Sequence, residues 1–100
     1  MIKMTPFTIE HATVTTIEVQ LPKTNLIIVS TEKGYIMCGA LDVGLINEKL
    51  AQREVICGRA IGVKTIEELL NAPLSDVTDA AKKLGIHVGM VGKEAIMRMI

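Results

Sequence analysis

Aromatic residues are almost absent from this chain of 100 residues, which has one tyrosine, one phenylalanine and no tryptophan. Since 49% of the residues are nevertheless hydrophobic, the core must be built from aliphatic side chains. Charge of one sign is also lacking, because 11 basic and 11 acidic residues give a net charge of zero. A chain without a basic excess has no electrostatic footprint for nucleic acid or for an anionic membrane. We therefore expect neither as a partner.

Cysteine is scarce too, with only Cys38 and Cys57. Two cysteines are too few for a disulfide scaffold, and their spacing is not that of a metal site. No apolar run approaches the 18 or so residues of a membrane span, and the N-terminal residues do not resemble a signal peptide. We expect one cytoplasmic domain over residues 1–100, with no cofactor and no metal.

What the chain does have is a strand, helix, strand unit at its centre. Residues 34–38 and 55–63 are typical of strands, and residues 43–54 between them have helical periodicity. In such a unit the two strands are parallel and the crossover is right-handed. Residues 4–10 and 26–29 are typical of earlier, antiparallel strands. Because proline donates no ladder hydrogen bond, the first of these strands either lies at a sheet edge or begins just after Pro6.

The fold class that follows is α/β of the α+β type, arranged as a two-layer sandwich. We expect a five-stranded mixed sheet, made of an antiparallel meander plus one parallel strand, with helices mainly on one face. A capping box at residues 65–68 predicts a short helix through Asn71. Residues 75–84 and 93–100 predict two further helices, the first ended by Gly85.

The strand at residues 13–21 has an irregular pattern. Val14 falls on the face opposite to the apolar residues that follow it, which predicts a bulge or a twist near Thr15. The later apolar residues share one face and are Ile17, Val19 and Leu21.

Residues 34–43, Gly-Tyr-Ile-Met-Cys-Gly-Ala-Leu-Asp-Val, resemble the signature of the YunC-like family, a domain-of-unknown-function family of bacteria and archaea. Residues 21–25, 62–66, 84–86 and 89–90 are similar to that family as well. The resemblance covers nearly the whole chain. It implies a small two-layer α/β domain without an assigned activity, and it supplies no catalytic residues.

One edge of the sheet is the candidate site, because parallel strands bring their carboxyl ends together and ligands bind there in open α/β sheets. Cys38 ends one parallel strand and Lys64 ends the next, each just before a helix N-terminus. Such a position favours a reactive thiolate and offers free N–H groups to an anion. The ligand-binding candidates beside Cys38 are Gly39, Ala40, Asp42, Lys64 and Thr65.

Each candidate also has a purely structural interpretation. Cysteine is often buried and inert, Asp42 is well placed as a helix N-cap, and Lys64 is typical of a solvated strand end. Arg59, on a central strand, must reach solvent, pair with an acid or enter an interface. Because Cys38 ends its strand while Cys57 begins the parallel neighbour, we expect no disulfide between them.

Two functions remain open at this point. The favoured one is a non-catalytic, self-associating module that binds a small anionic metabolite at the edge formed by Cys38 and Lys64. The alternative is a thiol-dependent enzyme with Cys38 as nucleophile, for which no base is visible. Self-association is expected because residues 26–29 suit burial on both faces, whereas helices in so short a chain cover mainly one. We expect a homo-oligomer, with a dimer favoured.

Overall fold

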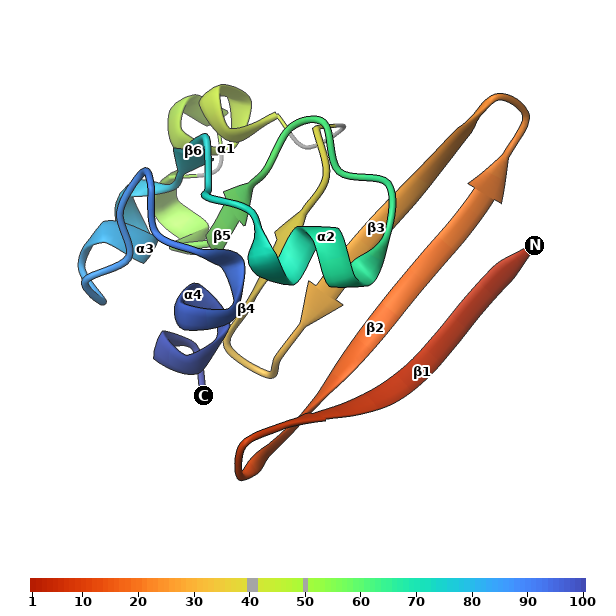
Figure 1. Ribbon diagram of the computed structural model, residues 1–100. Helices are drawn as coiled ribbons and strands as arrows, with labels where there is room; N and C mark the ends of the chain where they lie inside the picture. Colours follow the sequence, from red (N-terminus) through yellow and green to blue (C-terminus); the bar gives the residue numbers. More distant parts are fainter. Residues whose placement is uncertain (40–41, 50) are drawn as a thin grey trace.

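The computed structural model describes residues 1–39, 42–49 and 51–100. The described residues form a six-stranded sheet whose strands lie in sequence order (Figure 1). The strands are β1 (Ile2–Ile9), β2 (Ala12–Leu21), β3 (Thr24–Ser30), β4 (Gly34–Met37), β5 (Ile56–Arg59) and β6 (Asp76–Val77). The helices are α1 (Val43–Lys49), a 3₁₀ turn η1 (Ala51–Arg53), α2 (Ile66–Asn71), α3 (Asp79–Lys82) and α4 (Gly92–Arg98).

The expected fold class is confirmed. Strands β1 to β4 form an antiparallel meander, and β5 is parallel to β4 across the crossover that contains α1. The sheet has one strand more than expected, because the short β6 pairs with β5 in the antiparallel sense. The first two strands make a long hairpin that extends away from the helices (Figure 1).

The helices lie on both faces of the sheet, but unequally. The main core lies on one face, where side chains from α2, α3 and α4 pack against Ile27, Val29 and Ile36 of the central strands. A smaller cluster lies on the other face, where α1 supplies Val43 and Ile46. This smaller cluster covers only the end of the sheet that contains β4 and β5.

Of the bulge or twist expected near Thr15, the bulge is contradicted by the strand pairing. The register of β2 with both neighbours is continuous, from Ile9 opposite Ala12 to Leu21 opposite Thr24. Val14 is buried in the main core, so the later apolar residues of β2 lie on the opposite face of the sheet. The irregular pattern reflects a strand that is apolar on both faces.

Two of the expected helix starts were capped as predicted. The Oδ1 atom of Asp42 accepts a hydrogen bond from the backbone N–H of Leu45 at 2.9 Å. The hydroxyl of Thr65 accepts one from the backbone N–H of Glu68 at 3.1 Å. Both side chains satisfy N–H groups that the first turn of a helix leaves without partners.

The third expected helix begins later than its pattern suggested. Residues 76–77 form β6, and α3 begins only after Thr78, whose hydroxyl caps it. The fifth strand is shorter than expected, because β5 ends at Arg59. Residues 76–77 therefore pair with β5, although residues 75–76 were expected to begin a helix.

Candidate functional site

Cys38 follows β4 and lies in the main core, where only 6% of it is exposed. Its backbone N–H donates to the carbonyl of Ile27 at 3.1 Å, which holds the residue against β3. The prediction of a reactive thiol depended on an exposed Cys38. Burial prevents a reagent or substrate from reaching the sulfur, so the geometry favours a packing role.

The residues after Cys38 are placed as helix-capping and turn residues. Gly39 is exposed and lies beside Ile61, and Asp42 uses its carboxylate to cap α1. Ala40, the remaining candidate here, lies outside the described residues. The helix that follows has seven residues, which is too short to supply a strong N-terminal anion site.

Lys64 and Thr65 lie at the start of α2. The hydroxyl of Thr65 is engaged as the helix cap, and the backbone N–H of Lys64 donates to the Oε1 atom of Glu68 at 2.9 Å. The side chain of Lys64 is exposed. It lines a cleft of about 510 Å³, and the buried Cys38 is not among the residues that line this cleft.

The cleft beside Lys64 contains a residue that sequence reasoning missed. Lys23, in the turn between β2 and β3, lines the same cleft, and the polar side chains between the two lysines are those of Thr24 and Asn25. Among the residues that the structure describes, no acidic one lines this cleft. The sequence signal was the turn at residues 22–25, but nothing in it indicates that this turn lies beside the loop that follows β5.

The second cysteine is also buried and free, which confirms the absence of a disulfide. Burial raises the pKa of the Cys57 thiol, although hydrogen bonds with Tyr35 and Thr78 oppose that effect. The pKa of Tyr35 is raised too, first by burial and then by its proximity to Cys57. Both groups are therefore neutral near pH 7 and contribute packing and hydrogen bonds.

Arg59 takes one of the three places expected for it. Its Nε and Nη2 atoms donate to the Oδ2 atom of Asp76 at 3.0 and 2.6 Å. The two residues are opposite each other in the pairing of β5 with β6. The charge is thus matched across the short edge strand, and the pair remains partly exposed to solvent.

An uncovered apolar surface lies on the sheet face opposite the main core. We call it the open face and define it by six side chains that the strand register places on one side of β1, β2 and β3. They are Ile2, Met4, Ile17, Val19, Leu21 and Ile28. Ile2 and Met4 are 69% and 65% exposed, and α1 does not extend over them. Sequence reasoning grouped part of this set but did not identify the face as uncovered.

Searches for two common kinds of site gave negative results within the described ranges. No group of three or more histidine, cysteine or acidic residues there is arranged to hold a metal ion. No helix in these ranges is long and apolar enough to cross a membrane.

Comparison with known proteins identifies relatives over the whole chain. Residues 37–99 match the family described as "Domain of unknown function (DUF1805)". The chain is 55% identical over 100 residues to the uncharacterized protein YunC of Bacillus subtilis, covering 100% of this chain and 99% of that protein. Its fold is similar to the crystal structure of TA1206, a protein of unknown function from Thermoplasma acidophilum, with a TM-score of 0.89 and 27% identity. That similarity covers 100% of this chain and 94% of the other.

Proposed function

The chain belongs to the YunC-like family of domains of unknown function (DUF1805), and we propose that it acts as a non-catalytic module that forms a homodimer through its open face. The observation that carries this proposal is the apolar surface over β1, β2 and β3 on the side away from the main core. Six aliphatic side chains meet there, and Ile2, Met4 and Leu21 are 69%, 65% and 45% exposed.

The open face is large enough to matter. Three neighbouring strands of about eight residues span roughly 25 Å by roughly 14 Å, given the usual rise along a strand and the spacing between strands. Exposed apolar patches of more than a few hundred Å² mark interaction sites in soluble proteins. A standard interface buries about 800 Å² on each partner, roughly twice the flat area of this face, so an interface made by this face alone is a small one. A second copy of the chain offers an identical apolar surface and a net charge of zero.

Packing of faces is favoured over pairing of edges. Met1 and Gln20 exchange two backbone hydrogen bonds, of 2.8 and 3.3 Å. Hydrogen-bonded and non-hydrogen-bonded pairs alternate in an antiparallel ladder, so from Met1 onward every second residue of β1 directs its backbone groups toward β2. Pro6, opposite Thr15, is one of the intervening residues and turns its ring nitrogen to the free edge. That edge therefore lacks a donor at its middle, a common protection of edge strands against pairing.

The test is the oligomeric state of one charge substitution on each face of β2. Ile17 lies at the centre of the open face, opposite Met4 and Ile28. We expect the wild-type protein to sediment as a dimer at tens of micromolar and Ile17→Glu to sediment as a monomer, because a carboxylate cannot be buried unpaired between two sheets. Gln20→Glu adds the same charge to the other face of the strand and should leave the dimer intact. A wild-type monomer at all accessible concentrations contradicts the proposal.

A second candidate is retained for the anionic ligand, at a different place from the one first expected. The cleft between Lys23 and Lys64 is lined by donors and by no carboxylate, and Coulomb attraction therefore favours an anion there. Titration with inorganic phosphate should shift the backbone amide signals of residues 22–25 and 62–64. Lys23→Ala should remove most of that response. Glu32→Ala, a change on the next turn, should not affect it.

The thiol-dependent enzyme has no comparable support. Cys38 is buried against aliphatic neighbours and no cleft that we describe is lined by it. The self-associating module is therefore the function that the geometry supports best.

A further inference from the structure

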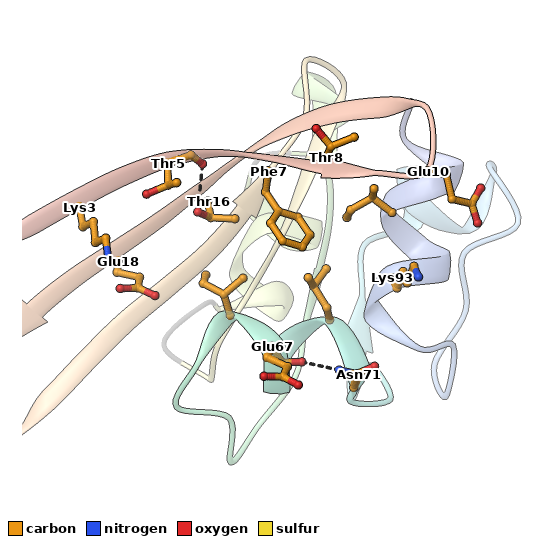
Figure 2. Close-up of a pocket in the computed structure, with 13 residues that line it drawn as sticks. Lys3, Thr5, Phe7, Thr8, Glu10, Thr16, Glu18, Glu67, Asn71 and Lys93 are labelled. Carbon is orange, nitrogen blue, oxygen red and sulfur yellow. Dashed lines mark hydrogen bonds between the residues drawn. The ribbon is translucent and has the colours of Figure 1, made fainter.

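The most extensive cleft described lies between the hairpin and α2, on the face that carries the main core. It has a volume of about 580 Å³ and is lined by β1, β2, α2 and the first turn of α4 (Figure 2). This volume lies within the range of natural ligand sites. The cleft is on the opposite side of the sheet from the open face, so the inference below does not depend on dimerisation.

The middle of the cleft is apolar. Phe7 projects from β1 toward α2, where Ile66 and Leu70 form the opposite wall (Figure 2). The ring of Phe7 remains 43% exposed, although alternation along β1 turns it to the core face. An aromatic side chain that is held over a cleft and half covered retains apolar surface for a ligand to bury.

Both ends of the cleft carry charges of both signs. At one end Lys3 lies directly opposite Glu18 in the pairing of β1 with β2. At the other end Glu10, in the hairpin turn, and Lys93, on α4, line the cleft together (Figure 2). Within the described part of the chain, none of these four side chains forms a salt bridge. A ligand can therefore find a positive and a negative partner at each end.

Two polar side chains that line the cleft already donate hydrogen bonds within the protein. The hydroxyl of Thr16 donates to the backbone carbonyl of Thr5 at 3.0 Å. On the α2 side, the amide of Asn71 donates to the carbonyl of Glu67 at 2.8 Å. Recognition in the cleft therefore rests on apolar contact beside Phe7 and on the charged groups, to which the α2 residue Glu67 adds a third carboxylate against the two lysines.

The distance between the ends restricts the ligand. Lys3 and Ile9 are six residues apart on an extended strand, which corresponds to about 20 Å. We propose that the cleft binds an extended oligopeptide of about six residues with an apolar centre and both termini charged. A phosphorylated ligand or a fatty acid carries charge of one sign, so it would use a lysine and leave the carboxylates without a partner. A zwitterionic chain meets an opposite charge wherever its termini lie.

The test uses a synthetic hexapeptide of alanine, leucine and valine with free termini, titrated into ¹⁵N-labelled protein. Backbone amide signals of β1 and α2 should shift together. The same peptide with blocked termini should bind several-fold more weakly, since the charge contacts are lost. Decanoate, an apolar chain with one carboxylate, should bind more weakly than the free peptide.

Two variants separate the contributions of the apolar centre and the charged ends. Phe7→Ala should weaken binding about tenfold, because a large apolar contact is lost. The matched control is Leu84→Ala, which removes an apolar side chain of similar exposure, 38%, away from the cleft. Lys93→Glu should weaken binding several-fold without changing the core, and Lys49→Glu should not affect it.

Three results would overturn the proposal. One is the absence of any amide shift at millimolar peptide. Another is equal affinity for free and blocked peptides, because charge at the ends would then play no part. The third is tighter binding of decanoate than of the free peptide, which would make the cleft a lipid site. Far-ultraviolet circular dichroism of each variant establishes that a loss of binding is not a loss of folding.

Discussion

The two ends of the sheet differ in how they are covered. At the end that contains β4 and β5, helices lie on both faces: Ile36 is buried under one layer and Cys57 under the other. At the end that contains β1 and β2, the described helices cover one face only around Ile9 and Val14, although both faces carry aliphatic side chains. The comparison shows that an apolar strand pattern indicates a tendency to be buried, and that it does not indicate which part of the molecule provides the burial.

Two adjacent residues of β3 allow a direct comparison of the two faces of the sheet. Ile27 is 1% exposed and packs in the main core, whereas Ile28 belongs to the open face and is only partly buried. The two residues have the same side chain and are neighbours in the same strand. Any difference in their contribution to stability is therefore a difference between the two faces.

The largest expected effect comes from truncating these two residues separately. Ile27→Ala should lower the free energy of unfolding by about 2–5 kcal/mol, the usual cost of a cavity in a packed aliphatic core. Ile28→Ala should cost about 1 kcal/mol or less in dilute protein, because its side chain leaves little empty space behind. Urea unfolding followed by circular dichroism measures both values.

The dependence of stability on protein concentration also distinguishes the two faces. If the open face is a dimer interface, wild-type stability rises with concentration, and Ile28→Ala should reduce that rise. The cost of Ile27→Ala should be the same at low and high concentration. Equal costs for the two variants in dilute protein would show that the two faces are equally covered within one chain.

The sequence predicted the elements that depend on short-range chemistry. Periodicity and capping residues predicted the parallel pair, the start of α1 at Asp42 and the start of α2 at Thr65. The two helix starts require interactions only within a few residues, and the parallel pair follows from the helical crossover that joins its strands. The later course of the chain was harder, because Thr78 has side-chain bonds to a strand more than twenty residues away and β6 consists of two residues.

The candidate site was less predictable than the fold. The strand order placed Cys38 and Lys64 at one edge, but it gave neither the depth of the cysteine nor the course of the loop after β5. Lys23 approaches Lys64 because a turn between two early strands lies beside that loop. Likewise, the sequence did not reveal which face of β2 the helices would cover. Such long-range contacts leave no local pattern in a single sequence.

The next largest effect is expected at the covered end of the sheet, in Thr78. Its hydroxyl accepts from the backbone N–H groups of Cys57 and Ala81, at 3.2 and 3.3 Å, and donates to the carbonyl of Val55 at 2.7 Å. Thr78→Val leaves these buried groups without partners and should cost about 3 kcal/mol of stability. Thr78→Ser keeps the hydroxyl and should cost clearly less. Equal losses would assign the effect to packing of the methyl group.

A smaller effect is expected at alkaline pH and tests the cluster under α1. Burial raises the pKa of Cys57 above the ordinary thiol value of 9.0. Above about that pH the unfolded chain releases the thiol proton while the native protein retains it, so stability should fall as the pH rises through this window. The contribution is fully present below pH 9. Tyr35, whose pKa is raised from 10.0, adds to the fall at higher pH.

The measurement is urea unfolding between pH 7.5 and 10.5. Cys57→Ala should make the dependence on pH less steep, and Tyr35→Phe should do so only in the upper part of the range. A wild-type stability that stays constant through pH 10 would mean that the cluster under α1 opens to water, and that this face is no better covered than the open face.

The last prediction is that a substitution of Lys64 does not change the reactivity of Cys38. Cys38 is 6% exposed under the main core, so iodoacetamide can reach it only when the native structure opens. An opening free energy of about 3 kcal/mol makes labelling roughly a hundredfold slower than that of a free thiol.

Because Lys64 lines a separate cleft, Lys64→Ala should leave the labelling rate of Cys38 unchanged while weakening the response to phosphate. Mass spectrometry of each cysteine measures the rates. Slower labelling of Cys38 in the variant, without any gain in stability, would show that the two residues act together at the sheet edge after all.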